Sequence, residues 1–260
     1  MKYRHVFISI LAVLVFGFLF SQDAMALYLW QKYQNADYAL ILVSNNADLA
    51  MNLGWHFFNG GAYDLPRAKK AYLKALKAKP DIVLAHYQLA RIYFVEGQFD
   101  EAFSEINREI DGNSSNLRAL YVRGLIYAYQ DDFLRAEDDF NRFIVWAPAE
   151  WAGYNDLSWV LLEQEKYAQS REIIKRALIM APEADNNPWL LNALGVSELN
   201  LGSHKDAANA FRRARNLVES LTIADWKKSY PGNDPAAAIG GLSSFKEAIS
   251  ENLRSSEAQL

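Results

Sequence analysis

The chain has 260 residues, of which 51% are hydrophobic and 22% charged, and its formal net charge is −4. This composition excludes a disordered or collagen-like chain, and the slight acidity argues against a nucleic-acid binder, which needs a basic face to neutralise phosphates. The absence of cysteine excludes disulfides, thiolate metal sites and a catalytic thiolate. Aromatic residues make up 13% of the chain, and this excess needs an explanation.

Residues 1–26 have the composition of an export signal. Lys2 and Arg4 precede fifteen uncharged, mostly apolar residues, 6–20, and the small-residue pattern Ala24-Met25-Ala26 follows. Fifteen helical residues span roughly 22 Å, less than the roughly 30 Å of a bilayer's hydrocarbon core. We therefore predict a signal peptide that is cleaved after Ala26. The alternative is an uncleaved segment that anchors the chain in the inner membrane.

Both alternatives place residues 27–260 outside the cytosol, provided that the positively charged N-terminus stays inside. A cysteine-free exported chain is typical of a bacterial envelope, so we predict a periplasmic or other extracytoplasmic location. Residues 27–46 are predicted to form a pre-repeat helical segment, because Trp30, Tyr33 and Leu40 are interspersed with Gln, Asn and Asp.

A period of 34 residues organises the chain from residue 47 onward. Proline lacks an amide hydrogen and disfavours helix in the residue before it, so a recurring proline predicts recurring helix ends. Small residues at fixed spacing allow two helix backbones to approach closely. The three series are Pro80, Ser114, Pro148 and Pro182; Ala68, Ala102, Ala136 and Ser170; and Gly54, Ala90, Gly124, Ser158 and Gly195.

This pattern resembles the tetratricopeptide-repeat (TPR) family, whose unit has 34 residues in two antiparallel helices. Bulky residues at the family's packing positions include Tyr93, Phe99, Tyr127, Phe133 and Tyr167. The resemblance implies an all-α fold, a right-handed α-solenoid of about five helix pairs, in which each pair buries its apolar face by stacking on its neighbours. It covers residues 47–221 and implies repeats at 47–82, 83–116, 117–150, 151–184 and 188–221.

Residues 222–260 are predicted to contain a turn, a C-terminal capping helix and a frayed tail. Over residues 236–256 apolar side chains recur every three or four positions, which predicts an amphipathic helix. Such a helix could cover the apolar end of the last repeat, and the alternative is that it docks on a partner. The apolar side chains of this helix are Ile239, Leu242, Phe245, Ile249 and Leu253.

The sequence contains no catalytic or metal-binding pattern. His86 and His204 fall at packing positions of the repeat, and neither has another histidine at the i, i+3 or i+4 spacing of a metal site. The acidic runs Asp131–Asp132 and Glu137–Asp139 are expected to be solvated surface. Glycine loops that bind phosphates and nucleophile motifs are also missing. We therefore expect no enzymatic activity, no cofactor and no metal ion.

In the tetratricopeptide family the first helices of successive repeats line a concave groove that binds a partner. The resemblance implies a protein or peptide partner, held here by aromatic side chains. For Phe58, Phe94 and Tyr129, ordinary packing between helices is an equal alternative. The ten residues predicted to line the groove are Met51, Trp55, Tyr87, Arg91, Arg118, Tyr121, Asn155, Trp159, Trp189 and Asn192.

The predicted function is a non-enzymatic scaffold or adaptor for protein–protein interaction in the cell envelope. Family members that bind chaperone C-termini hold the terminal carboxylate with Lys and Asn in the first repeat, where this chain has Met51 and Trp55, so that binding mode is not expected. The alternatives are a self-assembling solenoid, which would form homo-oligomers, and an accessory subunit of a membrane-associated enzyme or export complex. Nucleic acid is not an expected partner, and a membrane is one only through an uncleaved N-terminal segment.

Overall fold

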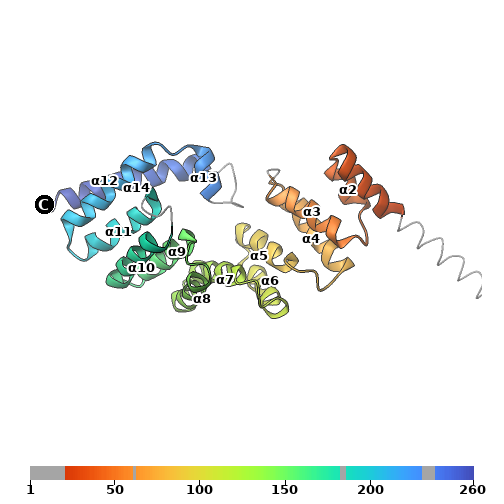
Figure 1. Ribbon diagram of the computed structural model, residues 1–260, viewed down its shortest axis with the longest axis horizontal. Helices are drawn as coiled ribbons and strands as arrows, with labels where there is room; N and C mark the ends of the chain where they lie inside the picture. Colours follow the sequence, from red (N-terminus) through yellow and green to blue (C-terminus); the bar gives the residue numbers. More distant parts are fainter. Residues whose placement is uncertain (1–20, 61–62, 182–185, 230–237) are drawn as a thin grey trace, which may run out of the picture. The chain divides into compact units, whose positions relative to one another are not determined.

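The computed structural model describes residues 21–60, 63–181, 186–229 and 238–260, which fold into helices joined by short turns (Figure 1). These described residues contain no β-strand. The chain divides into two compact units, one ending at Glu96 and the other starting at Gly97, and each has its own hydrophobic core. In the described part of the chain no helix is both long and apolar enough to cross a membrane. The predicted signal or anchor segment, residues 6–20, lies outside the described residues.

The described part of unit 1 begins with a helix that includes residues 21–33, and asparagine or aspartate side chains cap the three helices that follow it. The carboxamide oxygen of Asn46 accepts from the amide of Leu49 at 2.9 Å, and the Asp64 carboxylate accepts from the amide of Arg67 at 3.0 Å. Pro66 lies in the first turn of its helix, where a missing amide hydrogen removes no helical hydrogen bond. The helices are α2 (Ala36–Leu42), α3 (Ala47–Phe58), α4 (Leu65–Ala78) and α5 (Ala85–Val95).

Unit 2 contains the remaining helices, which are arranged largely as antiparallel pairs with two helices added at the C-terminal end (Figure 1). Its main core is formed largely by side chains of α8, α9 and α10, to which Ala128 of α7 and Leu190 and Ala193 of α11 are added. The helices are α6 (Phe99–Gly112), α7 (Arg118–Tyr129), α8 (Phe133–Trp146), α9 (Trp151–Glu163), α10 (Tyr167–Met180), α11 (Pro188–Asn200), α12 (His204–Glu219), α13 (Ile223–Ser229) and α14 (Ala238–Glu257).

Glycines on the first helix of a pair allow an aromatic ring of the second helix to come close. A Cβ atom built on Gly195 of α11 would lie 2.5 Å from the ring of Phe211, and one on Gly54 of α3 would lie 2.5 Å from the ring of Tyr72. Both rings are fully buried. The recurring small residues therefore fix the distance between paired helices, and the aromatic residues opposite them account for part of the aromatic excess.

In the α9–α10 pair serine takes the place of glycine. The hydroxyls of Ser158 and Ser170 are 2.7 Å apart, those of Ser170 and Ser197 are 2.8 Å apart, and Ser197 donates to the carbonyl of Ala193 at 2.9 Å. All three serines are fully buried. This chain of hydrogen bonds satisfies three polar groups within the core and links α9, α10 and α11.

The exposure of one acidic residue, Asp139, differs from the sequence-based prediction. Asp139 of α8, predicted to be solvated surface, is 1% exposed and accepts two hydrogen bonds from the Arg123 guanidinium of α7, at 2.7 and 2.8 Å. The hydrogen bonds to Asp139 raise the pKa of Arg123. The helical period places Asp139 on the inner face of α8, because Ala136, Phe140 and Phe143 on either side of it are buried.

The C-terminal helix α14 covers the last helix pair. Leu242, Ile249 and Leu253 are buried against residues of α11 and α12, and the Arg212 guanidinium of α12 donates to Glu257 at 2.9 and 3.0 Å. Ile239, predicted for the same apolar face, is instead 65% exposed, because the buried face of α14 runs through Ala238 and Leu242 and Ile239 is one residue out of phase with it. The predicted fold class, an all-α array of helix pairs with a C-terminal capping helix, is confirmed.

Candidate functional site

In unit 1, four of the predicted groove residues lie on the first helices α3 and α5. Trp55 is 56% exposed, whereas Met51, Tyr87 and Arg91 are half-buried. Arg91 is held by its neighbours, because its guanidinium donates to Asn59 Oδ1 at 3.0 Å and to Gln88 Oε1 at 2.9 Å. Trp55 is therefore the one large aromatic side chain of this predicted set that unit 1 presents openly.

Arg91 also stacks on aromatic rings of unit 1. Its guanidinium carbon lies 4.8 Å from the centre of the Phe58 ring and 5.7 Å from that of Tyr87. Phe58 is 2% exposed, so its ring packs between helices. A cation held between two rings and two side-chain oxygens is fixed in place, and it organises this face of unit 1.

In unit 2 the first helices α7 and α9 bring Tyr121 and Asn155 together at a carboxylate. The Tyr121 hydroxyl donates to Asp156 Oδ2 at 2.6 Å, and the Asn155 amide donates to Asp156 Oδ1 at 3.1 Å. Burial raises the pKa of Asp156, and the hydrogen bonds from Tyr121 and Asn155 lower it by a smaller amount. The Asp156 carboxylate is therefore desolvated and receives hydrogen bonds from both sides.

Two aromatic rings lie beside this carboxylate on the same pair of helices. The rings of Tyr129 on α7 and Trp159 on α9 meet edge to face with their centres 5.6 Å apart. Tyr129 is 57% exposed, and the Trp159 indole nitrogen donates to Glu163 at 3.0 Å. We call this region the α7–α9 face; it consists of Tyr121, Tyr129, Asn155, Asp156 and Trp159.

Arg118, at the first position of α7, lies apart from this carboxylate in an ion pair. It donates to Glu150 at 2.6 Å, and its guanidinium carbon lies 5.9 Å from the centre of the Trp146 ring. Both partners of the ion pair are about half-exposed, so the pair is accessible but contributes little to the free energy of unfolding.

The structure places Trp189 and Asn192 beneath the C-terminal helices. Trp189 is 7% exposed, and its ring stacks on Trp151 of α9 at 5.3 Å and on Phe245 of α14 at 5.6 Å. The amide of Asn252 on α14 reaches Asn192 at 3.5 Å. The expectation that Trp189 lines an open groove therefore needs correction, because α13 and α14 pack over this end of α11.

Two members of the α7–α9 face were not among the ten predicted residues. For Tyr129 the sequence leaves packing between helices as an equal alternative, and for Asp156 it predicts no role. A signal for Asp156 exists in the sequence, because it lies three residues before Trp159 and therefore one turn away on the same side of α9.

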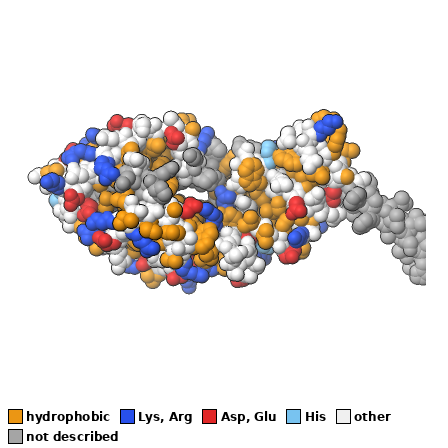
Figure 2. All heavy atoms as spheres, in the orientation of Figure 1, with side chains coloured by type: hydrophobic (Ala, Val, Ile, Leu, Met, Phe, Trp, Pro, Cys, Tyr) orange, Lys and Arg blue, Asp and Glu red, His pale blue; other side chains and the backbone are white. Residues whose placement is uncertain are grey.

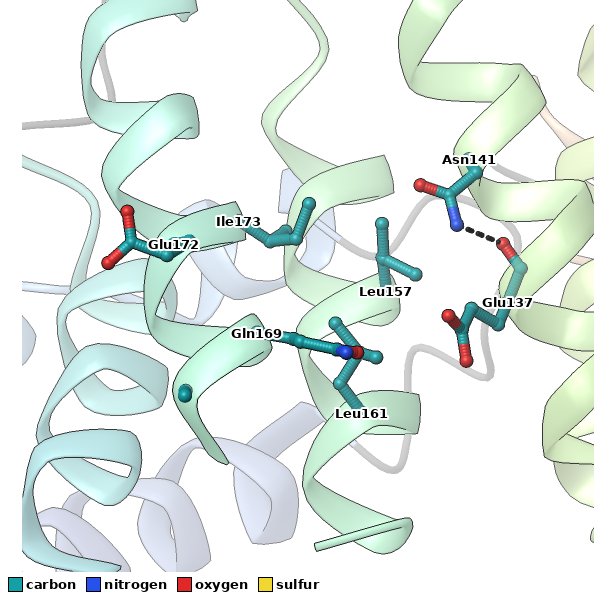
Figure 3. Close-up of a pocket in the computed structure, with 8 residues that line it drawn as sticks. Glu137, Asn141, Leu157, Leu161, Gln169, Glu172 and Ile173 are labelled. Carbon is teal, nitrogen blue, oxygen red and sulfur yellow. Dashed lines mark hydrogen bonds between the residues drawn. The ribbon is translucent and has the colours of Figure 1, made fainter. Parts of the chain in front are cut away.

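On the second-helix side of unit 2, a pocket of about 440 Å³ opens between α8, α9 and α10 (Figure 3). Leu157, Leu161 and Ile173 form its apolar floor. The Glu137 carboxylate at its rim is already paired with Lys166 at 2.8 Å. The pocket therefore suits an apolar side chain better than a charged ligand. No sequence motif predicted it, because its residues come from three helices.

The burial of Asp156 in the α7–α9 face leads to a prediction about how the stability of the fold depends on pH. Because the pKa of Asp156 is raised above its ordinary value of 3.8, the folded chain binds a proton more readily than the unfolded chain. The carboxylate therefore destabilises the folded state at neutral pH, and this cost disappears as the pH falls through the raised pKa. Each unit of raised pKa corresponds to roughly 1.4 kcal/mol.

Urea unfolding of the wild type and of Asp156→Asn between pH 4.5 and 8 measures this cost. The asparagine keeps an acceptor oxygen for Tyr121, so we expect the variant to be more stable than the wild type at pH 8. The difference should shrink as the pH is lowered. A difference that stays constant across this range would show that Asp156 has an ordinary pKa.

Comparisons with known proteins relate this geometry to a family. A family model described as "Tetratricopeptide repeat" matches residues 64–117, 121–188 and 155–217. A curated relative, ETO1-like protein 2 of Arabidopsis thaliana, is 27% identical over 132 residues, which are 51% of this chain and 13% of that protein. The chain thus matches only a small part of the length of this relative.

Solved structures show similarity of fold at low identity. One titled "Crystal structure of MamA protein" is 20% identical with a TM-score of 0.57, over 71% of this chain and 94% of that one. PilW, titled a "widely conserved type IV pilus biogenesis factor", is 18% identical with a TM-score of 0.60, over 82% and 91%. YrrB, titled "a TPR protein with an unusual peptide-binding site", is 14% identical with a TM-score of 0.56, over 72% and 93%.

Proposed function

The chain belongs to the tetratricopeptide-repeat family, and from this premise we propose that it is a protein-interaction scaffold whose α7–α9 face binds a segment of a partner protein. The observation that carries the proposal is the combination of an aromatic pair, the exposed Tyr129 and the half-exposed Trp159, with the desolvated carboxylate of Asp156. Tetratricopeptide proteins are in general interaction modules without catalysis. Among the described residues, no group of three or more His, Asp or Glu side chains could hold a metal ion.

The chemistry of this face indicates what kind of segment it would bind. Aromatic rings with both an apolar face and a polar edge suit apolar side chains of a peptide or an amphipathic helix. A desolvated carboxylate favours a cationic group beside them, since pairing offsets the cost of its burial. Residues 97–260 carry 17 Lys and Arg against 25 Asp and Glu, so unit 2 as a whole attracts a basic partner.

We therefore propose a partner segment with apolar side chains and at least one Lys or Arg. Two desolvated aromatic anchors support binding of order −8 kcal/mol, or a Kd in the micromolar range. In unit 1, Trp55 is proposed as a separate interaction site of its own, since it is exposed and aromatic. Because α14 already covers the apolar end of the last helix pair, stacking of copies through that end has less support than binding of a partner.

The proposed setting of this scaffold is the cell envelope. It is supported by the order of charged and apolar residues before Ala26 and by the fold similarity to PilW, whose title places that protein in pilus biogenesis. Assembly of a larger envelope complex around a bound segment is consistent with both observations. The alternative is that the chain is an accessory subunit of an envelope enzyme and binds that enzyme through the same face.

Site-specific crosslinking can test the α7–α9 face, because the chain has no native cysteine. A photoactivatable label on Glu163→Cys, at the end of α9, should crosslink a partner from envelope extracts. The same label on Val145→Cys of α8, which is 71% exposed, is the matched control and should not. Adducts of the same proteins from both positions would contradict the proposed face.

Alanine substitutions then measure the contribution of the aromatic pair. Once the partner is identified, we expect Tyr129→Ala and Trp159→Ala each to weaken binding by roughly 30-fold, because a buried aromatic anchor contributes about 2 kcal/mol. Leu134→Ala on α8, where the side chain is 72% exposed, should leave the Kd unchanged. Isothermal titration with a partner peptide gives these constants. Equal affinity of all three variants would reject the proposal.

A further inference from the structure

The helix of residues 21–33 is part of the folded core of unit 1. The Asp23 carboxylate accepts hydrogen bonds from the amide of Ser44 at 2.7 Å and from the amide of Asn45 at 3.0 Å. Ala26 is fully buried, and Trp30 meets His56 edge to face at 5.1 Å. Cleavage after Ala26 would remove both the Asp23 carboxylate and the buried Ala26 from this core.

Helix α4 of unit 1 is strongly basic in an acidic protein. Its fourteen residues include Arg67, Lys69, Lys70, Lys74 and Lys77 and no Asp or Glu. Lys70 and Lys77 form no ion pair with any residue that the structure describes. Residues 21–96 carry 8 Lys and Arg against 6 Asp and Glu, in contrast to the excess of acidic residues in unit 2. The positive charge is therefore gathered on one helix.

Helix α2 lies alongside α4 and adds exposed apolar side chains to it. The two are linked by the Arg67–Asp37 ion pair at 3.2 Å and by hydrogen bonds from Lys74 to the carbonyls of Ile41 at 3.2 Å and Val43 at 2.6 Å. Tyr38 is 61% exposed, Ile41 63% and Leu73 48%. Figure 2 shows apolar side chains at several places on the surface of the chain. We call Tyr38, Ile41, Lys70, Leu73 and Lys77 the α2–α4 face.

The part of unit 1 that the structure describes begins at residue 21, close to the connection between α2 and α3. Residue 20 is three positions before Asp23, whose carboxylate contacts Ser44 and Asn45. Lys74 of α4 contacts the carbonyl of Val43 in the same connection. In the sequence, the fifteen uncharged residues thus end just before Asp23, which contacts the connection after α2 that Lys74 of α4 also contacts.

We propose that the α2–α4 face lies on the surface of an anionic lipid bilayer, into which the retained residues 6–20 insert. Basic side chains near a helix surface are attracted to anionic headgroups, and tyrosine with exposed aliphatic side chains is suited to the boundary between headgroups and acyl chains. A membrane-inserted segment that is continuous with this edge keeps the face close to the headgroups. This surface is in unit 1 and is distinct from the α7–α9 face, so each proposal can fail without the other.

Fluorescence quenching on the full chain tests the contact. Ile41→Cys, and as a control Ile179→Cys of α10, which is 82% exposed, are labelled with an environment-sensitive fluorophore and reconstituted into vesicles. The vesicles contain either phosphatidylcholine alone or 30% phosphatidylglycerol, with a lipid-borne quencher. We expect strong quenching of the label at position 41 in anionic vesicles and none at position 179. Equal exposure of both labels to aqueous iodide would overturn the proposal, as would failure of the chain to bind either vesicle.

Charge reversal separates the α2–α4 face from the inserted segment. Lys70→Glu/Lys77→Glu should abolish the quenching at position 41 in anionic vesicles while the protein still pellets with them, and raising the salt concentration should have the same effect. Lys205→Glu/Lys227→Glu, a matched reversal on exposed residues of unit 2, should retain the quenching. Unchanged quenching in the Lys70→Glu/Lys77→Glu variant would overturn the electrostatic contact. Binding of duplex DNA that Lys70→Glu/Lys77→Glu abolishes, without lipid quenching, would assign the face to nucleic acid instead.

The N-terminus of the exported protein tests whether residues 6–20 are retained. Intact-mass measurement on the protein recovered from a bacterial envelope should show the segment still attached. A mature chain that begins at Leu27 would overturn the inference, because the inserted segment and Asp23 would both be gone.

Discussion

Asp139→Ala is expected to lower the free energy of unfolding by about 3–5 kcal/mol, because it leaves the Arg123 guanidinium in a largely buried position without its anionic partner. Asp139 is 1% exposed and accepts both hydrogen bonds at 2.7–2.8 Å, and the remaining acceptor near Arg123 is Asn107 Oδ1 at 3.2 Å. An arginine cannot lose its proton in a protein to relieve this cost. Urea unfolding followed by circular dichroism measures the change.

Two further variants separate the unpaired charge from other effects. Asp138→Ala changes the neighbouring carboxylate, which is exposed, and should alter the free energy of unfolding by less than about 0.5 kcal/mol. Arg123→Leu/Asp139→Leu removes both charges and should be considerably more stable than Asp139→Ala, since no unpaired charge remains. A double variant as unstable as Asp139→Ala would show that the loss comes from packing and not from the unpaired guanidinium.

Trp189→Ala is also expected to lower the free energy of unfolding by about 3–5 kcal/mol, because Trp189 fills the space where four helices of unit 2 meet. Its ring lies against Trp151 of α9, Phe245 of α14 and Trp226 of α13, at centre distances of 5.3, 5.6 and 5.9 Å. Truncation would leave a cavity and remove the stacking contacts that hold α13 and α14 in place. Hydrogen exchange of the α14 amides should therefore increase along with the loss of global stability.

Trp159→Ala is the matched control for this prediction. Both tryptophans were predicted to line the groove, but Trp159 is half-exposed on the α7–α9 face whereas Trp189 is buried. We expect Trp159→Ala to change the free energy of unfolding by no more than about 1 kcal/mol and to weaken partner binding. The opposite result, a stable Trp189→Ala variant and an unfolded Trp159→Ala variant, would reverse the assignment of the two residues.

The arrangement of helices was predictable because it depends on a local pattern that repeats. The 34-residue spacing of small residues and prolines follows from helix geometry, since close backbone approach and helix termination are imposed by the nearest neighbours along the chain. Gly195 against Phe211 and Gly54 against Tyr72 are the contacts that this pattern requires. The apolar face of α14 was predictable on the same ground, apart from Ile239 at its first turn.

The accessibility of individual side chains was not predictable, because it depends on what packs over them from distant parts of the sequence. Trp189 and Trp159 lie on the first helices of neighbouring repeats, yet α13 and α14 cover one and leave the other half-exposed. Asp139 belongs to an acidic run of the kind that usually lies on a solvated surface. Only the position of Arg123 on α7 shows that the charge of Asp139 is compensated. Asp156 likewise became part of a candidate site through Tyr121, 35 residues away in the sequence.

The sequence by itself therefore determined the family, the all-α fold and the absence of a recognisable catalytic motif, because each of these is encoded in spacing and residue type along one segment. Only the tertiary structure decided which aromatic and acidic residues are open to a partner. It also showed that Asp23 and Ala26 are tied into the folded part of unit 1, since Ala26 is buried and hydrogen bonds from Ser44 and Asn45 to Asp23 join segments that no local pattern relates.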